Sequence, residues 1–251
     1  MPPLGSAGHD QMDPAAYRLV HGLEAKHWFF VGRRRIIASL LSGLPRGRIL
    51  DIGCGTGSTL QVLEGFGVAI GVDCSAQAVG FARGRGAFRL CQAFANRLPF
   101  ADGSVDLVAA LDLVEHLEDD CSAMLEFRRV LKVGGCLLLS APAFGLLWSD
   151  FDRLSGHYRR YSRQGLRELV EGAGFAIGRL SYFDTVLFPA IWAIRSVRNA
   201  LGRWLRFRSD LELSPMPLNG VLAALFGSEA ILLRLQDLPF GASLVCVARK
   251  T

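Results

Sequence analysis

The sequence predicts an α/β fold built on a mostly parallel sheet with helices on both faces. Between residues 48 and 141, short apolar segments alternate with helical segments, which is typical of parallel strands buried on both sides. A glycine-rich turn joins the first strand to a helix, and acidic residues stand at the ends of three strands: Asp51, Asp73 and Asp112. Ligands of such sheets bind beyond the carboxyl ends of the strands, so we expect one binding edge there.

Composition sets limits on this fold. The chain has 251 residues, of which 51% are hydrophobic, enough for one large α/β domain with a packed core. Its net charge of +5 suits an anionic partner or an ordinary basic surface equally well. The six cysteines show no C-x-x-C pair and no Cys/His ligand spacing, so we predict neither a disulfide framework nor a metal site. Without a signal-peptide pattern, we expect a reduced, cytoplasmic setting.

The region before the sheet, residues 14–47, is expected to form a helical lid. Residues 1–13 are rich in proline and glycine and are predicted to be a disordered tail. Capping residues and apolar spacing predict helices over residues 14–25 and 33–44. Between these helices, the His-Trp pair at 27–28 either covers a bound cofactor or packs in the core.

The remaining segments alternate regularly, as a doubly wound sheet requires. Residues 48–182 are expected to form a cofactor-binding core, 183–237 a helical insertion, and 238–251 a hairpin return with the final strand, all within one domain. Strands are predicted at residues 49–52, 68–72, 87–91, 105–111, 136–141 and 175–182. Helices are predicted at residues 59–66, 119–131, 162–173 and 218–235.

The turn after the first strand has the glycine spacing G-x-G-x-G, at Gly53, Gly55 and Gly57. These glycines let a ligand approach the backbone, but a dinucleotide fingerprint would need its last glycine at position 58, which is serine. The acidic Asp51 also suits the pyrophosphate of NAD poorly, whereas it suits the cationic amino group of S-adenosylmethionine. Asp73, 22 positions later, can accept hydrogen bonds from ribose hydroxyls. We therefore favour S-adenosylmethionine over NAD.

Five segments follow one another in a fixed order between residues 48 and 142: Leu50–Gly57, Gly71–Ser75, Leu98–Leu107, Val114–Leu117 and Arg129–Gly135. Together they resemble the motifs of class I S-adenosylmethionine-dependent methyltransferases. Flanking segments at 27–29, 147–149 and 157–161 resemble one small-molecule branch, the methyltransferase type 11-like proteins. The resemblance implies a Rossmann-like, doubly wound sheet of seven strands, in which the last strand is antiparallel.

The resemblance also implies where the cofactor binds. The residues that correspond to the family's cofactor-binding positions are Asp51, Gly53, Cys54, Gly55, Thr56, Gly57, Asp73, Cys74, Ala95, Asn96 and Leu111. Asp51 would lie near the amino group, Asp73 at the ribose and Cys74 against the adenine. The chain departs from the family at Phe94, because an acidic residue often stands two positions before the residue that corresponds to Asn96.

Four residues are candidates for a general base, which methyl transfer needs only when the acceptor must lose a proton: His116, His157, Tyr158 and Tyr161. Of these, we favour His116, His157 and Tyr161. His116 follows the fourth predicted strand, where it either acts in catalysis or orients the next helix. His157 and Tyr161 belong to the polar and aromatic segment 155–161. The histidine and two arginines of this segment suit deprotonation and recognition of an anionic acceptor, or else they brace the loop.

The insertion contains an apolar run, residues 185–194, that continues into several arginines between Arg195 and Arg208. The run is too short to span a bilayer, which needs about 18–20 residues. Apolar and aromatic residues interleaved with arginines suit an interfacial helix on anionic lipid. Together with the predicted helix at 218–235, the run could equally close a hydrophobic acceptor pocket or simply pack on the sheet.

We therefore expect a methyltransferase that acts on a small hydrophobic or anionic acceptor, lipid-linked ones included, with peripheral membrane contact through Arg195–Arg208. The alternative is a non-catalytic cofactor-binding or membrane-associated scaffold of the same fold. A nucleic-acid substrate is not expected, because Leu111-Asp-Leu-Val114 occupies the place of the N/D-P-P-Y/F motif after the fourth strand. Neither the identity of the acceptor nor the oligomeric state follows from the sequence.

Overall fold

The computed structural model describes residues 14–86, 88–201, 215 and 217–251. The strands are β1 (Arg48–Ile52), β2 (Val68–Asp73), β3 (Arg89–Gln92), β4 (Val105–Leu111), β5 (Leu131–Pro142), β6 (Phe175–Phe183) and β7 (Ser243–Lys250). The helices are α1 (Pro14–Leu23), α2 (Trp28–Leu41), α3 (Leu60–Leu63), α4 (Ala76–Arg85), α5 (Asp120–Val130), α6 (Asp150–Leu154), α7 (Arg163–Gly172), α8 (Phe188–Leu201) and α9 (Leu218–Leu235), with short 3₁₀ turns η1 (Val114–His116) and η2 (Gly145–Leu147). The predicted tail over residues 1–13 and part of the predicted insertion, residues 202–214, lie outside the described residues.

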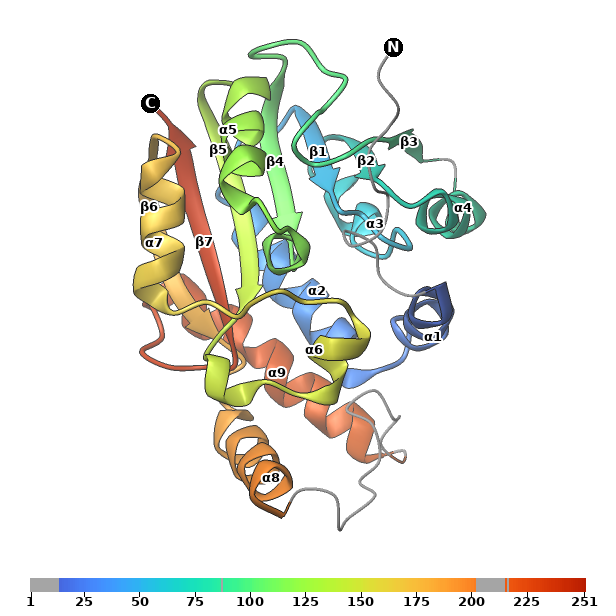
Figure 1. The fold of residues 1–251 in the computed structure, drawn as a ribbon, viewed down its shortest axis with the longest axis vertical. Helices are drawn as coiled ribbons and strands as arrows, with labels where there is room; N and C mark the ends of the chain where they lie inside the picture. The colour runs from blue at the N-terminus through green and yellow to red at the C-terminus, as the bar shows by residue number, and fades with distance from the viewer. Residues whose placement is uncertain (1–13, 87, 202–214, 216) are drawn as a thin grey trace.

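The described strands form one seven-stranded sheet in the order β3-β2-β1-β4-β5-β7-β6 (Figure 1). Neighbouring strands from β3 to β5 are parallel, and β7 runs antiparallel to both β5 and β6. The strand order reverses between β1 and β4, the point at which such sheets bind ligands. The predicted fold class is confirmed, including the antiparallel last strand and the helix that precedes it.

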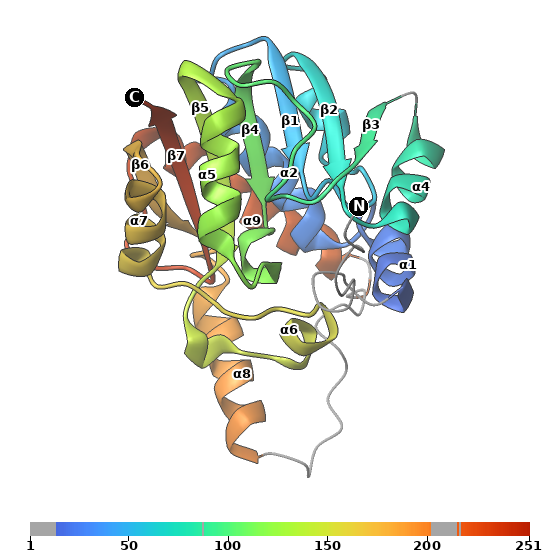
Figure 2. The same ribbon diagram turned by 45° about the horizontal axis from the view of Figure 1, so that its top comes forward.

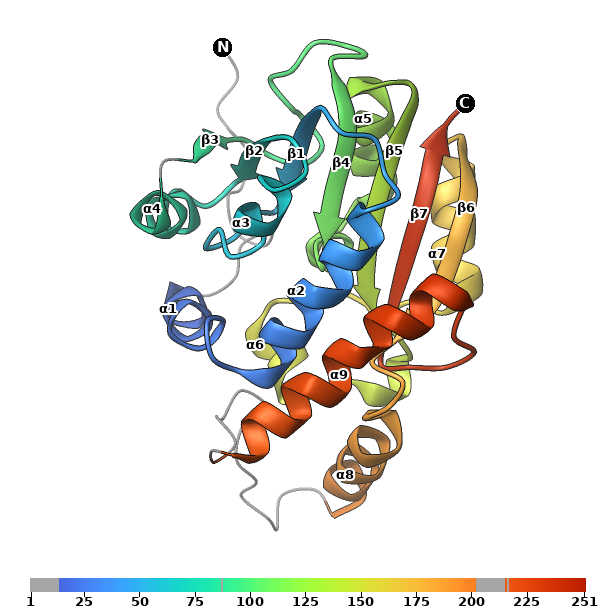
Figure 3. The ribbon, with the colours of Figure 1, turned by 180° about the vertical axis from the view of Figure 1, so that it is seen from behind.

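Helices cover both faces of this sheet. α5 and α7 lie on one face (Figure 2), and α2 and α9 cross the other (Figure 3). Leu50 of β1 joins the core under α5 and α7, while its neighbour Ile49 joins the core under α2 and α9. The largest fully buried side chains of the two cores are Phe127 and Phe226. Burial of a side chain of this size stabilises the folded state by roughly 1.5–3 kcal/mol. Because apolar residues alternate between the two faces of β1, this strand packs against both helical layers.

The helices α2 and α9 approach each other closely. A Cβ atom at Gly32 of α2 would lie 2.5 Å from Cδ1 of Phe226, so only glycine fits the crossing without a shift. Trp28 and Phe29 surround the same ring, at centroid distances of 5.8 and 5.6 Å. Of the two interpretations of Trp28, core packing is therefore the one that the structure shows.

Two elements begin earlier than the sequence pattern predicts. α2 starts at Trp28 rather than at residue 33, because the Trp28 N–H donates to Asn219 Oδ1 (2.9 Å) and the Phe29 N–H donates to His27 Nδ1 (3.3 Å). These bonds satisfy N–H groups that a helix start leaves without partners. β5 starts at Leu131, and its register against β4 shifts around Gly134, whose φ of 78° is open mainly to glycine.

The carboxyl ends of β1, β2, β4 and β5 meet at one edge of the sheet. α1, α6 and α8 lie beyond this edge (Figure 1). Segments from before the sheet, from within it and from the predicted insertion therefore meet where the topology places a ligand.

Candidate functional site

The turn between β1 and α3 is shaped to lie under a ligand. Gly53, Gly55 and Gly57 all have left-handed backbone conformations, with φ of 72°, 53° and 84°. A Cβ atom at Gly53 would lie 2.7 Å from Leu113, and one at Gly57 would lie 2.9 Å from Ala82. At Gly55, by contrast, a Cβ atom would meet nothing within 4 Å. Because Gly53 and Gly57 lack a Cβ atom, the turn can pack closely against Leu113 and Ala82, whereas Gly55 borders open space.

Asp51 presents a buried carboxylate at the end of β1, next to the glycine turn. Its side chain is only 2% exposed, and Oδ2 has no hydrogen-bond partner among the described residues. Burial raises the pKa of Asp51 to about 7, against the opposing effect of Arg33, while Asp73 adds to the rise. An unpartnered buried carboxylate beside a glycine turn fits a ligand ammonium group, such as the amino group of S-adenosylmethionine.

Asp73 ends β2 on the other side of the turn. It is buried, and its two carboxylate oxygens accept hydrogen bonds from the backbone N–H groups of Gly55 and Ser75, both at 2.9 Å. Burial raises its pKa, and these two bonds act in the opposite direction. Because each carboxylate oxygen has a second lone pair, Asp73 retains acceptors for two ribose hydroxyls. Tyr17 of α1 lies near this end of β2, where burial and the charge of Asp73 raise the pKa of its phenol.

The predicted adenine-binding residues follow β2 and β3. Cys74 and Ala95 are half-buried, and Asn96 is exposed in a tight turn whose Arg97 N–H donates to the carbonyl of Phe94 (3.1 Å). Phe94, which stands where the family often has an acid, is 40% exposed. An apolar ring at this position suits stacking rather than hydrogen bonding with the adenine edge.

Thr56 and Cys54 have structural roles in the turn. The Thr56 side chain is buried, and its hydroxyl donates to the carboxylate of Glu24, just after α1. Arg85 of α4 pairs with the same carboxylate and donates from Nε to the Thr56 carbonyl (2.7 Å). Cys54 is buried as a small apolar side chain. The contacts of Glu24 with Thr56 and Arg85 could not be predicted from the sequence, because the three residues belong to three separate segments of the chain.

The end of β4 connects the turn to α2. Leu111 is buried, and the next residue, Asp112, has a left-handed φ of 55°. One Asp112 oxygen accepts a hydrogen bond from Ser140 Oγ (2.8 Å), and the other lies 2.7 Å from Nη2 of Arg33. Arg33 thus pairs with Asp112, and its charge also opposes the rise in the pKa of Asp51. In the sequence, Arg33 is the first of three consecutive arginines, a pattern that does not indicate this contact.

His116 and His157, two of the predicted catalytic residues, are brought together. Their ring centroids lie 4.5 Å apart with the ring planes at 88°. Burial and the proximity of His157 lower the pKa of His116 to about 3, so its imidazole is neutral. His157 Nδ1 lies 2.8 Å from Asp152 Oδ1. Burial opposes ionisation of Asp152, but the hydrogen bonds from His157 and Arg160 outweigh it and hold the pKa of this carboxyl well below its usual range.

The third predicted catalytic residue, Tyr161, is not part of this pair. Its hydroxyl donates to Asp120 Oδ2 (2.6 Å) and lies 3.2 Å from the Val114 carbonyl. Burial and the bond with Asp120 raise the pKa of the phenol. Such a hydroxyl is a poor proton acceptor, and its contacts join the 155–161 segment to η1.

The two arginines of the same segment are also engaged inside the protein. Arg160 donates to both carboxylate oxygens of Asp152, each at 2.8 Å. Arg159 donates to Asp120 (3.0 Å) and to the carbonyl of Glu118 (2.7 Å). Of the two interpretations of these arginines, bracing of the loop matches their contacts.

Glu115 lies beside the histidine pair. It is fully buried, and neither carboxylate oxygen has a hydrogen-bond partner among the described residues. Burial and the charge of Asp112 raise its pKa well above the usual range. In the sequence, Glu115 belongs to the motif Val114–Leu117, which predicts no separate role for it.

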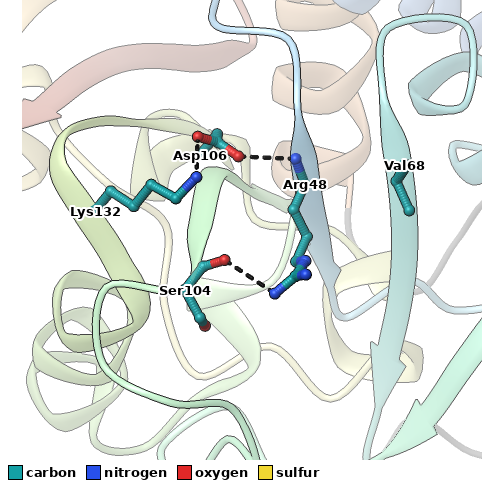
Figure 4. A pocket seen from close by; sticks show the side chains of 5 residues that line it. All are labelled: Arg48, Val68, Ser104, Asp106 and Lys132. Carbon is teal, nitrogen blue, oxygen red and sulfur yellow. Dashed lines mark hydrogen bonds and ion pairs between the residues drawn. The ribbon is translucent and has the colours of Figure 1, made fainter.

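A separate hollow lies at the opposite, amino-terminal edge of the sheet (Figure 4). Asp106 at its centre accepts hydrogen bonds from Lys132 Nζ (2.7 Å) and from the Arg48 backbone N–H (2.9 Å). Arg48 also donates from Nη1 to the Ser104 carbonyl (3.3 Å). Asp106, Lys132 and Arg48 pair with one another, whereas the Ser104 hydroxyl has no hydrogen-bond partner among the described residues.

Comparison with known proteins agrees with this geometry. Residues 50–139 match the family model described as a methyltransferase domain. A protein of Encephalitozoon cuniculi, named as a methyltransferase, is 30% identical over 151 residues, which cover 51% of this chain and 70% of the relative. A protein of Mycolicibacterium smegmatis, named as an S-adenosylmethionine-dependent methyltransferase, is 32% identical over 168 residues, or 64% of each chain. The matched regions span between half and 70% of the lengths of the first curated relatives.

Solved structures show the same fold. A Haloferax volcanii protein, described as a methyltransferase and solved in complex with the Trm112 methyltransferase activator, superimposes with a TM-score of 0.63 over 96% of both chains. The sequence identity of this pair is 20%, so the likeness concerns the fold alone.

Proposed function

Because this chain belongs to the class I S-adenosylmethionine-dependent methyltransferases, we propose that it transfers the methyl group of this cofactor to a small, largely apolar acceptor. The observation that carries the proposal is the unpartnered Asp51 carboxylate next to the open space at Gly55. Asp51 would hold the amino group of the cofactor, and Asp73 would hold its ribose. The sulfonium methyl group would then point along the sheet edge towards η1 and the 155–161 segment.

Catalysis would come mainly from alignment. Methyl transfer from a sulfonium is an in-line displacement, so a fixed approach of acceptor and methyl supplies much of the rate. α1, held by the Glu24 ion pair, would exclude water from the cofactor side. His157 or the neutral His116 would accept a proton if the acceptor has to lose one.

The preference for an apolar acceptor rests on the charges near the edge. Arg159 and Arg160 both form ion pairs with carboxylates of the protein. They are therefore engaged within the protein rather than placed to bind an anionic acceptor, as was predicted for them. Phe144, Phe188 and Phe240 form a chain of ring contacts from the end of β5 to α8, with centroid distances of 5.7–5.8 Å. Aromatic side chains of this kind favour a flat or hydrophobic molecule.

A second proposal concerns a membrane surface. Trp192, Ile194 and Val197 of α8 are 48–55% exposed, and α9 adds Leu218, Val221, Leu225 and Leu235. α9 is long and apolar enough to cross a membrane by length and composition, yet Phe226, Glu229 and Leu233 bury one side of it against the domain. We propose that these two helices contact lipid peripherally at the cytoplasmic surface, with the predicted contribution of residues 195–208.

Turnover tests the main proposal. The purified chain is incubated with S-adenosylmethionine and fractions of a lipid and metabolite extract, and release of S-adenosylhomocysteine is measured. We expect release with an apolar fraction and none with nucleic acid. A non-catalytic scaffold would bind the cofactor and release nothing with any fraction.

Co-sedimentation with liposomes that contain anionic lipid tests the second proposal. We expect binding at low salt that is reduced at least severalfold by the double change Trp192→Ser and Ile194→Ser. Val133→Ser, which alters an exposed apolar residue at the start of β5, is the matched control and should bind as the wild type does. Equal binding of all three proteins would contradict the membrane proposal.

A further inference from the structure

Glu115, His116 and His157 come together from two segments of the chain. One ligand atom of each lies within 4.8 Å of those of the other two. Glu115 and His116 belong to η1, and His157 belongs to the 155–161 segment, which is joined to η1 by a hydrogen bond from the Tyr158 N–H to the Glu115 carbonyl (2.7 Å). Two imidazoles and one carboxylate are a donor set of zinc and related divalent ions.

The outer contacts of the two histidines match those of metal ligands. His157 uses Nδ1 to contact the carboxylate of Asp152, and the backbone of Ser155 favours the protonated form of the His116 ring. Metal-bound histidines usually donate their second ring nitrogen to a carboxylate or a backbone carbonyl, which fixes the tautomer and aims the other nitrogen at the metal. Asp152 is fixed in turn by Arg160.

The buried carboxyl group of Glu115 is the main evidence for a bound cation. It is fully buried, and both oxygens lack a hydrogen-bond partner among the described residues. Leaving a buried carboxyl group unsatisfied costs several kcal/mol, and such groups are normally paired or bound to metal. The two arginines whose charges act on Glu115 are paired elsewhere, Arg33 with Asp112 and Arg160 with Asp152.

We propose that Glu115, His116 and His157 bind one divalent transition-metal ion of the zinc type, leaving a coordination position open. Ligand atoms about 2 Å from such an ion lie up to roughly 4 Å apart, so small side-chain rotations bring the three atoms into range. The site lies next to the cofactor turn, because η1 follows Leu113, which packs against Gly53. An acceptor hydroxyl in the open position would have a lowered pKa and would release its proton to water, so methyl transfer would need neither histidine as a base.

This proposal departs from the sequence-based prediction of no metal site, which rested on the spacing of cysteines. Glu115 and His116 are adjacent, but His157 lies 41 positions later in the chain, and this arrangement shows no recognisable ligand spacing. Their convergence depends on the loop contacts of Asp152 and Tyr158.

Metal binding is tested without cofactor or acceptor, so its failure would be distinct from failure of the proposed methyl transfer. The untagged full-length chain is stripped with a chelator and titrated with ZnCl₂ by calorimetry, and with CoCl₂ by visible absorption. We expect one ion per chain. Binding should weaken at least about 100-fold in Glu115→Gln and in His157→Gln, and about 10–100-fold in Asp152→Asn.

Asp184→Asn is the matched control, because Asp184 is also a buried acid with an unpartnered oxygen, at the end of β6. It should bind zinc as the wild type does. Thermal unfolding without metal shows that each variant is folded, and Glu115→Gln should be about as stable as the wild type because it replaces one buried polar group with another of similar size. Absence of one-to-one zinc binding, or retention of wild-type affinity in either ligand variant, would overturn the proposal.

Discussion

The proposed cofactor half and the proposed acceptor half of the binding edge are built in different ways. The cofactor half takes its groups from short continuous segments, Gly53–Gly57 and Asp73–Ser75, held mainly by backbone geometry and backbone hydrogen bonds. The acceptor half joins η1, α6 and the 155–161 segment through side-chain contacts, with Asp152 at their centre. Local geometry specifies the donor, whereas the acceptor site depends on contacts between distant segments.

The largest expected effect concerns the charge of Asp51. Its carboxylate must be ionised to pair with the cofactor's ammonium group, and its pKa is about 7. The affinity for S-adenosylmethionine should therefore fall about tenfold for each pH unit below 7, or roughly hundredfold at pH 5. Without cofactor, the free energy of unfolding depends on pH in the opposite direction. Between about pH 4 and 7, the unfolded chain releases the Asp51 proton while the folded chain keeps it, so the free energy of unfolding falls as the pH rises.

Calorimetry with S-adenosylmethionine between pH 5 and 8 measures this dependence. Asp51→Asn removes the titrating group and should bind weakly with a much flatter pH profile. Wild-type affinity that stays constant between pH 7 and pH 5 would show that Asp51 does not hold the amino group.

A smaller effect is expected when the turn is altered. Gly57→Ala places a side chain in a left-handed conformation and 2.9 Å from Ala82, which should cost about 2 kcal/mol of unfolding free energy and lower cofactor affinity about tenfold. Gly80→Ala in α4 meets nothing within 4 Å and should be neutral or stabilising by up to about 1 kcal/mol. Urea unfolding and calorimetry distinguish them, and equal effects of the two changes would contradict the role given to the turn.

The smallest expected effect on cofactor binding concerns the contact between α1 and the turn. Glu24→Gln removes the charge that Thr56 and Arg85 share, and breaking a buried pair costs about 3–5 kcal/mol. If α1 covers the cofactor, amide exchange over residues 14–23 should accelerate and cofactor release should become severalfold faster. Glu64→Gln, which alters an exposed pair at 4.0 Å, should change neither quantity. Unchanged exchange in Glu24→Gln would argue against a lid.

The same contrast explains what could be predicted from the sequence. Apolar alternation places β4 and α9 at their observed bounds, and the G-x-G-x-G spacing identifies the cofactor edge. α6 was not predicted, since it is a five-residue helix held by its capping box at Ser149 rather than by a long apolar face.

The acceptor half could not be derived in this way. Nothing in the sequence shows that Glu115 is buried without a partner or that Arg160 is bound to Asp152, because each fact depends on the packing of loops against η1. The arginines of the 155–161 segment suggested an anionic acceptor, whereas their contacts are internal.

The measurement that tests the central claim most directly is calorimetric titration of the full chain with S-adenosylmethionine. We expect one-to-one binding that Asp73→Ala weakens about hundredfold or more, since two hydrogen bonds to a charged group are lost. Asp106→Asn, at the opposite edge of the sheet, should bind as the wild type does. Equal binding by Asp73→Ala, or clear thermal stabilisation of the wild type by NAD, would contradict the assignment of this edge to S-adenosylmethionine.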